Sequence, residues 1–307
     1  MNVWLMPYFY CARQKLSDML RYTPTPIVEI TDPIVEKAGV RLLMKREDLN
    51  HPLVSGNKWW KLKYNLEEAQ HQSKRTLLTF GGAYSNHIYA TAAAAAELGF
   101  NSIGIIRGEE TLPLNNTLSF AVEQGMDLHY VSREHYRTKT TRDFINQLQQ
   151  QFGDFYLIPE GGSNELAVAG VSGFAQTLGH DFDYVCCAVG TGGTLAGLIK
   201  GLPSKEIIGF SVLKNGEFLN HDVASRAGEQ QNWKIMTDYH CGGYAKTNAA
   251  LEQFIQQFEK RSSIPLDHVY TGKMMAGVYD LIQKGYFQKG STILTLHTGG
   301  LQGKRLF

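Results

Sequence analysis

Two lysines at the start of one predicted helix are the first residues of this sequence that could do chemistry. Lys58 ends the segment Ser-Gly-Asn-Lys (55–58), and Lys61 follows one turn later on the same face of the helix. Ser55 or Asn57 can cap this helix. Two cations at a helix N-terminus oppose the helix dipole and repel each other, so a bound anion would stabilise them. Two solvated surface lysines are the plainer interpretation of the same pattern.

A glycine–threonine turn, Gly-Thr-Gly-Gly-Thr (190–194), offers a second place for an anion. It lies between the apolar run 184–189 and a helical pattern that begins at Leu195. Backbone N–H groups of such a turn, at a helix N-terminus, bind phosphate. The dinucleotide pattern G-x-G-x-x-G would need glycine where Leu195 stands, and no Gly-Lys-Ser/Thr of a P-loop follows. A monophosphate site therefore remains, beside the alternative of a tight turn without a ligand.

A third motif, Gly-Gly-Ala-Tyr-Ser-Asn-His (81–87), runs from the predicted strand 76–80 into an alanine-rich helix, 86–98. Its two glycines permit a ligand to approach the backbone closely. Ser85 and Asn86 can cap the helix while presenting polar atoms at the carboxyl end of a strand. An N-cap next to turn glycines, without any ligand, is the alternative.

Two further motifs, 269–273 (VYTGK) and 297–300 (HTGG), each stand at a predicted strand end, where a structural role is the simpler interpretation. Taken together, however, the motifs contain the parts that pyridoxal phosphate (PLP) requires. They supply a lysine for a Schiff base, a cradle for a phosphate group and an asparagine for the ring hydroxyl. The combination predicts a PLP site.

These motifs are spaced along a chain in which short apolar runs alternate with helical patterns. The predicted strands are 41–46, 76–80, 102–106, 127–131, 155–158, 184–189, 207–212 and 291–296; the predicted helices include 86–98, 140–152, 165–178, 195–202 and 247–260. The alternation predicts an α/β fold of two parallel sheets with helices on both faces. Ligands in such folds lie at the carboxyl ends of strands, where the motifs stand.

Composition excludes several classes of protein. The 307 residues include 30 Lys plus Arg and 29 Asp plus Glu, so a net charge of +1 gives no basic surface for nucleic acid or anionic lipid. No apolar run reaches the ~18 residues that span a bilayer, and the apolar segment 1–15 lacks the charge order of a signal peptide. The four cysteines form no CxxC pair, which favours free thiols in a cytoplasmic protein and no metal site.

The motifs together resemble the 1-aminocyclopropane-1-carboxylate deaminase and D-cysteine desulfhydrase family. They are KREDLNHPLVSGNKWWKL, GGAYSNH, GTGGT, YTGKMMAGVYDL and HTGGLQG, in collinear order from about Thr25 to Gly303. The resemblance implies a PLP-dependent enzyme of fold type II, the tryptophan-synthase-β-like fold. It also implies a homodimer, and a large domain (1–61 and 171–307) interrupted by a smaller one (62–170) with the active site between them.

The resemblance assigns roles residue by residue. Lys58 matches the Schiff-base lysine, Ser85 the serine near the substrate carboxylate and α-carbon, and Tyr244 and Tyr270 the two active-site tyrosines. The implied cofactor contacts are Lys58, Lys61, Asn86 at the ring O3′, Thr191, Gly192, Gly193, Thr194 and Thr271. The implied substrate contacts are Asn57, Tyr84, Ser85 and His87.

Residue 271 discriminates within the family. Deaminase-type sequences carry a glutamate that faces the pyridine nitrogen, where this sequence has Thr271. A carboxylate stabilises the protonated ring, the strong electron sink needed to open a cyclopropane, whereas a hydroxyl only hydrogen-bonds to it. A weaker sink suffices when a good leaving group departs from the β-carbon. We therefore expect elimination on a small D-amino acid, D-cysteine giving pyruvate, ammonia and hydrogen sulfide.

Other functions remain open at the level of sequence. The same fold could carry a ring-opening deaminase, another D-amino-acid lyase or a racemase, and Tyr84 next to Ser85 departs from the family pattern in the pocket wall. A non-catalytic PLP-binding protein and a nicotinamide dehydrogenase are alternatives of other classes, the latter weakened by Leu195. Trp59 and Trp60 are expected to be buried at a domain or subunit contact.

Overall fold

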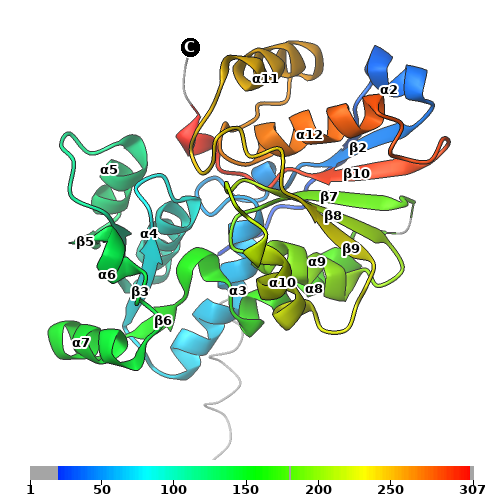
Figure 1. Cartoon of the computed structure of the whole chain (residues 1–307). Helices are drawn as coiled ribbons and strands as arrows, with labels where there is room; N and C mark the ends of the chain where they lie inside the picture. The colour runs from blue at the N-terminus through cyan, green and yellow to red at the C-terminus, as the bar shows by residue number, and fades with distance from the viewer. Residues whose placement is uncertain (1–19, 180, 305–307) are drawn as a thin grey trace, which may run out of the picture.

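The computed structural model describes residues 20–179 and 181–304. Their strands form two separate sheets (Figure 1). The six-stranded sheet has the order β1-β2-β10-β7-β8-β9, and the four-stranded sheet has the order β5-β4-β3-β6. The strands are β1 (Ile27–Glu29), β2 (Arg41–Lys45), β3 (Thr76–Gly81), β4 (Asn101–Arg107), β5 (Met126–Val131), β6 (Tyr156–Ile158), β7 (Tyr184–Val189), β8 (Glu206–Ser211), β9 (Trp233–Met236) and β10 (Thr292–Leu296).

Strand pairing is parallel in both sheets except at one edge, where β1 runs antiparallel to β2. The eight predicted strands are confirmed within two residues at their ends. The sequence did not indicate β1 or β9, because three or four residues are too few for a periodic pattern. The expected strand end before Tyr270 is wrong. Residues 264–269 form no strand, and Tyr270 is instead the N-cap of helix α12 (Thr271–Gln283).

Helices cover both faces of both sheets, which confirms the predicted α/β fold. On the larger sheet, α2, α11 and α12 pack on one face and α8, α9 and α10 on the other (Figure 1). On the smaller sheet, α4 and α5 lie on one face and α6 and α7 on the other. The helices are α2 (Pro33–Ala38), α3 (Asn57–His71), α4 (Asn86–Leu98), α5 (Asn116–Glu123), α6 (Arg133–Tyr136), α7 (Arg142–Phe152), α8 (Glu165–Gln176), α9 (Gly193–Gly201), α10 (Phe218–Ala227), α11 (Ala249–Ser262) and α12 (Thr271–Gln283).

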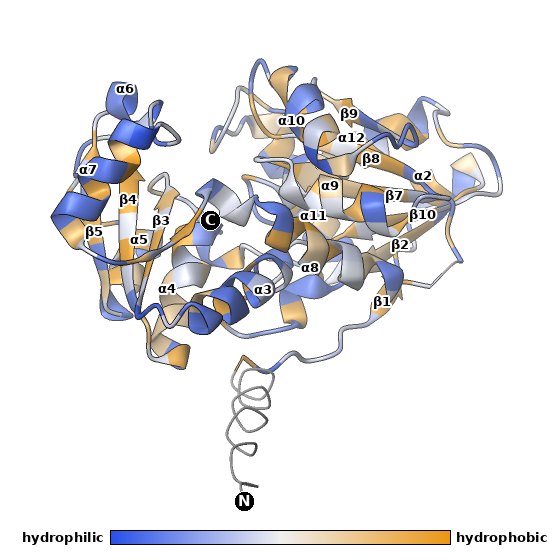
Figure 2. Cartoon of the chain, turned by 90° about the horizontal axis from the view of Figure 1, so that it is seen from below, coloured by the Kyte–Doolittle hydropathy of each residue, from blue (hydrophilic) through white to orange (hydrophobic). Residues whose placement is uncertain are grey.

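The burial of apolar side chains explains these layers. Strands of both sheets are mainly hydrophobic, whereas α7 is largely hydrophilic on the side that faces away from them (Figure 2). The buried residues of α7 are Phe144 and Leu148, which pack against the smaller sheet. None of the helices in the described ranges is both long and apolar enough to cross a membrane.

Trp60 joins the apolar cores of the two sheets. Its ring stacks on Phe174 of α8 with 4.9 Å between centroids and meets Trp59 edge-on at 4.7 Å. Its indole N–H donates to Glu47 at 2.7 Å, so the polar atom is satisfied. Trp59 is buried as expected and Trp60 is partly buried, whereas the expectations for the segment 1–15 and for Cys11 fall outside the described residues.

The strands divide along the chain as an inserted unit requires. Residues 76–158 supply the strands of the smaller sheet, and the flanking segments supply those of the larger one. The predicted boundaries at 61/62 and 170/171 fall inside α3 and α8. These two helices pack closely at Gly170. A Cβ added to Gly170 would lie only 2.1 Å from the Trp60 carbonyl oxygen, so a larger residue would not fit there. The boundaries themselves stay a prediction.

Candidate active site

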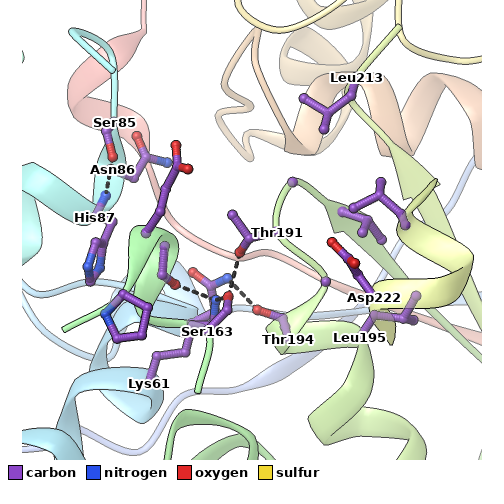
Figure 3. Close-up of a pocket in the computed structure, with 18 of the residues that line it drawn as sticks. Lys61, Ser85, Asn86, His87, Ser163, Thr191, Thr194, Leu195, Leu213 and Asp222 are labelled. Carbon is purple, nitrogen blue, oxygen red and sulfur yellow. Dashed lines mark hydrogen bonds between the residues drawn. The ribbon is translucent and has the colours of Figure 1, made fainter. Parts of the chain in front are cut away.

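A cleft of about 470 Å³ lies between the two sheets. Much of its lining comes from the end of β4 and from the segments that follow β3, β6, β7 and β8, so it lies at the carboxyl ends of strands, as the fold predicts. Figure 3 shows part of this lining, in which segments far apart in the sequence converge. The predicted site residues that line the cleft are Asn57, Lys58, Lys61, Ser85, Asn86, His87, Thr191, Gly192, Thr194, Tyr244 and Tyr270.

Three predicted site residues do not line the cleft. Tyr84 is 51% exposed, and only its backbone carbonyl takes part in the site. Gly193 is buried behind the turn, where a Cβ would lie 2.7 Å from Ser163 Oγ and 3.1 Å from Lys61 Nζ. Thr271 is fully buried, and its hydroxyl donates to a neighbouring carboxylate.

Lys58 lies in the first turn of α3, and Gly56 directs the chain into that helix. Gly56 has a positive φ of 69°, and a Cβ there would lie 2.0 Å from the Thr298 carbonyl oxygen, so only glycine fits. The helix has no side-chain cap, which corrects the expectation that Ser55 or Asn57 caps it. The Lys58 side chain therefore reaches the cleft from a turn that requires glycine at position 56.

Asn50 holds this turn with a two-point clamp. Its amide donates to the Gly56 carbonyl at 3.0 Å and accepts from the Gly56 N–H at 2.9 Å. Asn50 is fully buried, and it also donates to the buried carboxylate of Glu47 at 3.0 Å. The segment KREDLN thus fixes the start of α3 and, with it, the position of Lys58.

The surroundings of Lys58 favour a nucleophilic amine. Burial lowers its pKa from the usual 10.5 to about 8, and the carboxylate of Asp267 acts in the opposite direction. Lys58 Nζ donates to Asn57 Oδ1 at 2.8 Å, and Asn57 in turn donates to Thr194 Oγ1 at 2.7 Å. A substantial neutral fraction at neutral pH is what attack on an aldehyde needs.

The turn before α9 has the geometry of a phosphate cradle. Gly192 is the N-cap with a positive φ of 80°, and no side chain caps the helix. The first N–H groups of α9 are therefore free to bind an anion. Thr191 and Thr194 stand on either side of this turn and line the cleft (Figure 3).

Two cations face this cradle without a carboxylate partner among the described residues. Lys61 is 2% exposed and donates to the Gly161 carbonyl and to Ser163 Oγ, the latter at 3.0 Å. Arg226 donates to the Thr191 carbonyl at 3.2 Å. Burial, followed by the nearby charges of Lys58 and Arg226, lowers the pKa of Lys61. A phosphate dianion would stabilise the charged form of Lys61, so these residues fit the phosphate group of PLP.

Ser85 and two tyrosines form the opposite side of the cleft. Ser85 Oγ accepts from the N–H groups of His87 and Ile88 at 3.2 and 3.3 Å, which caps α4 and leaves its own proton free to donate. Tyr244 donates to the Tyr84 carbonyl at 3.3 Å, and Tyr270 donates to Tyr244 at 3.4 Å. Burial raises the pKa of both tyrosines, so they keep their protons at neutral pH.

The last glycine motif explains the position of Asn86. A Cβ on Gly300 would lie 2.0 Å from Asn86 Nδ2, so a larger residue at 300 would displace that amide. Asn86 Oδ1 accepts from Gln302 at 2.6 Å, and its amide group remains at the cleft. His87 is buried beside it against the Thr79 hydroxyl at 2.8 Å, and burial lowers its pKa so that the ring is neutral.

Thr271 has a different neighbour from the one expected. Its hydroxyl donates to Asp267 Oδ2 at 2.7 Å and accepts from the Asp267 N–H at 2.9 Å. Asp267 also accepts from the backbone of Val269, Tyr270 and Thr271, and so holds the start of α12. The proton of the Thr271 hydroxyl is therefore already donated within the protein.

The sequence assigned no role to eight polar residues of the cleft. They are Arg107, Lys139, Thr140, Glu160, Ser163, Asp222, Arg226 and Thr298. Arg107 ends β4, and Glu160 and Ser163 follow β6, so the rule that ligands bind after strands could have found these three. Lys139 pairs with Glu160 at 3.2 Å. Arg226 lies on α10, where no motif marked it.

The geometry is that of an enzyme that uses an aldehyde cofactor with a phosphate group. One cleft between the two sheets brings together a lysine with a lowered pKa, a phosphate cradle and acid–base groups. The chain belongs to the family of pyridoxal-phosphate-dependent enzymes, whose family model matches residues 19–299. The cofactor and the fold type II architecture expected from the sequence are thereby confirmed.

Individual relatives narrow the class to lyases and deaminases. The chain is 30% identical to the D-cysteine desulfhydrase of Klebsiella pneumoniae, over 90% of this chain and 92% of that protein. It is 31% identical to the bifunctional mitochondrial D-cysteine desulfhydrase/1-aminocyclopropane-1-carboxylate deaminase of Arabidopsis thaliana, over 92% and 78%. The crystal structure of an ACC deaminase homologue superposes with a TM-score of 0.77 at 30% identity, covering 94% of this chain and 95% of that one. The protein is a PLP-dependent enzyme of this lyase and deaminase group.

Proposed function

We propose that this enzyme eliminates the β-substituent of a small D-amino acid, and that D-cysteine is its substrate. With water, D-cysteine gives pyruvate, ammonia and hydrogen sulfide. The observation that carries the proposal is the arrangement of Lys58, Ser85 and the Tyr244–Tyr270 pair around one cleft with a phosphate cradle. The names of the relatives support elimination as well as ring opening.

The residues of the chain divide the work of this reaction. When bound, PLP supplies an electron-withdrawing ring that stabilises negative charge at the substrate α-carbon. Lys58 would bind the cofactor aldehyde and, once freed by the substrate amine, accept the α-proton at Nζ. Ser85 would donate its free proton to the substrate carboxylate, beside the N-terminus of α4. The carbon–sulfur bond breaks as the α-proton leaves, and Tyr244 would turn its hydroxyl proton from the Tyr84 carbonyl to the departing sulfur and donate it there.

The choice of D-cysteine over a cyclopropane substrate rests on the family comparison at residue 271. Deaminase-type sequences carry a glutamate where this chain has Thr271, which is buried beside Asp267 and does not line the cleft, so residue 271 supplies no carboxylate to a protonated pyridine ring. Elimination needs less stabilisation, because the leaving sulfur carries the charge away. We also propose, from the family resemblance alone, a homodimeric cytoplasmic enzyme with a smaller domain at 62–170.

A substrate panel tests the proposal. Purified holoenzyme is assayed for sulfide and pyruvate with D-cysteine, L-cysteine, β-chloro-D-alanine and 1-aminocyclopropane-1-carboxylate. We expect the highest kcat/KM with D-cysteine and no sulfide from the L-enantiomer. A preference for the cyclopropane, detected as 2-oxobutyrate, would replace the proposal with the deaminase. Turnover of none of the four would refute it.

The role of Lys58 is tested with a matched pair of variants. Lys58→Ala should lose turnover by at least ~10³-fold and lose covalent fixation of the cofactor by borohydride, measured by peptide mass. Lys63→Ala is the control, because Lys63 belongs to the same helix but does not line the cleft. Borohydride labelling elsewhere than Lys58 would contradict the assignment.

A further inference from the structure

The segment 240–246, which carries Tyr244, is held in an unusual backbone conformation. Four of its residues have positive φ: Cys241 at 50°, Gly242 at 93°, Gly243 at 118° and Ala245 at 55°. Such angles are unfavourable for the two residues that have a Cβ. We call this segment the tyrosine strap. Because its backbone is strained, the position of Tyr244 depends on contacts that hold the strap in place.

Hydrogen bonds within the strap join near neighbours. The Gly242 N–H donates to His240 Nδ1 at 2.9 Å, the Gly243 N–H donates to the His240 carbonyl at 3.0 Å, and the Lys246 N–H donates to the Gly243 carbonyl at 3.1 Å. None of these bonds fixes the strap relative to the rest of the protein. Cys241 and Tyr244 pack against the core of the larger sheet, and a backbone carbonyl of the strap is bonded from another element.

Lys273 provides that bond from the first turn of α12. Its ammonium group donates to the Gly243 carbonyl at 2.7 Å, directly before Tyr244 in the chain. The side chain is fully buried, and no carboxylate among the described residues lies within salt-bridge distance of it. Burial lowers its pKa to about 8, with Cys241 and Asp267 acting in the opposite direction. A buried lysine without an acid partner is costly, which points to a requirement for its one observed bond.

The same helix also sets the second tyrosine. Tyr270 is the N-cap residue of α12, and its hydroxyl donates to that of Tyr244 at 3.4 Å. Lys273 lies three residues later, so one helical turn carries Tyr270 and fastens the strap that carries Tyr244. The separation of the two hydroxyl groups thus depends on α12 and on the length of the Lys273 side chain.

We propose that Lys273 is a positioning residue, which fastens the tyrosine strap to α12 and thereby holds the Tyr244 hydroxyl in register with that of Tyr270. Lys273 does not line the cleft, so it acts through Tyr244 and touches neither cofactor nor substrate. The expected loss of turnover rests on the proposed function, in which Tyr244 donates a proton. The expected loosening of the strap does not depend on the proposed function.

The first test measures the strap itself. In Lys273→Met, which keeps the apolar stem but removes the ammonium donor, amide hydrogen exchange of peptides covering 240–246 should become at least ~10-fold faster in the holoenzyme. Lys284→Met is the matched control, since that lysine lies at the exposed end of the same helix and pairs with Asp280. Unchanged exchange in Lys273→Met, or equal quickening in both variants, overturns the proposal.

The second test asks whether Lys273 acts through Tyr244. Lys273→Met should lower kcat by ~10- to 100-fold while KM and cofactor occupancy stay within about threefold. In a Tyr244→Phe background, the same substitution should cost less than about threefold, because the hydroxyl that it positions is already absent. If Lys273→Met lowers kcat by the same factor in the Tyr244→Phe background as in the wild type, the loss reflects a general structural defect and overturns the proposal.

Two provisions keep the outcomes distinct. If Lys273→Met does not fold, Lys273→Gln, whose shorter amide cannot span the same gap but remains polar, is measured instead with the same expected results. If the wild type turns over none of the tested amino acids, the proposed function fails, while hydrogen exchange still decides whether Lys273 fastens the strap. A loosened strap with unchanged kcat overturns the positioning role and leaves the proposed function standing.

Discussion

At Lys58, two opposing effects set the pKa of the amine. Removal from water lowers it, and the carboxylate of Asp267 raises it, with a net result of about 8 against the usual 10.5. At pH 7 this makes the neutral amine on the order of 10²-fold more abundant than on an exposed lysine. The residue type identified Lys58 as a candidate, but only its environment makes it a ready nucleophile.

The pH dependence of cofactor uptake follows from this pKa. The rate at which apoprotein binds PLP covalently should rise with pH up to about 8 and then level off, because the neutral amine reacts. Asp267→Asn should shift the profile to lower pH, since it removes the charge that raises the Lys58 pKa. Stopped-flow absorbance measures both. A profile that still rises above pH 10 would contradict the lowered pKa.

The contact between Thr271 and Asp267 changes what a substitution at 271 would do. Thr271→Glu would place a second carboxylate beside that of Asp267 at a site that is 0% exposed. We expect a loss of on the order of 3 kcal/mol of unfolding free energy rather than a new cyclopropane activity. Urea unfolding measures the loss. Thr271→Ser, which keeps the hydroxyl, is the control, and equal stability of all three proteins would refute the argument.

At the scale of elements, two of the glycine motifs are explained by a close approach between segments. The Gly56 backbone touches the Thr298 carbonyl, and Gly300 touches the Asn86 amide. The first and last motifs of the chain therefore meet at one wall of the cleft. The pattern of glycines was visible in the sequence, whereas the partner of each glycine was not.

The start of α9 offers a test of the phosphate cradle. Gly193→Ala should weaken PLP binding by ~10- to 100-fold, because the added Cβ would displace Ser163 and Lys61 from the cradle. Gly173→Ala on α8 is the control, because a Cβ there meets nothing within 4 Å. Equilibrium dialysis or fluorescence titration gives both dissociation constants. Equal affinity of the Gly193→Ala variant and the wild type would show that the cradle tolerates the group.

At the scale of the whole molecule, the cleft is built from both sheets, so its ligand links them. The 190–194 turn follows β7 of the larger sheet, whereas Ser85 and Asn86 follow β3 of the smaller one. A cofactor bound to the folded cleft stabilises the whole arrangement, since the unfolded chain does not form the cleft.

Cofactor loading should therefore stabilise the protein as a unit. With free PLP at a hundred times its dissociation constant, the gain is about 2.7 kcal/mol. Urea unfolding, followed by both tryptophan fluorescence and circular dichroism, should show the midpoint move upward for both signals. Lys61→Met should reduce the gain. An unchanged midpoint on loading would contradict a site shared by the two sheets.

The sequence by itself determined the local features. Periodicity located eight strands, and the glycine, lysine and serine motifs after those strands located most of the cleft, because parallel strands carry their ligands at one edge. Periodicity could not find β1 and β9, which are too short, or the true start of α12, where a side chain of Asp267 rather than a strand precedes the helix.

Only the tertiary structure decided which partners these residues have. In the fold, the Thr271 hydroxyl donates to Asp267, and the Tyr84 side chain is exposed. Arg226 and Ser163 line the cleft, and the buried Lys273 bonds to the segment that carries Tyr244. Burial and hydrogen bonding depend on residues far apart in the chain, and no local pattern encodes them. The residue types determine which chemical groups the protein has. The folded surroundings determine the pKa, the orientation and the partner of each group.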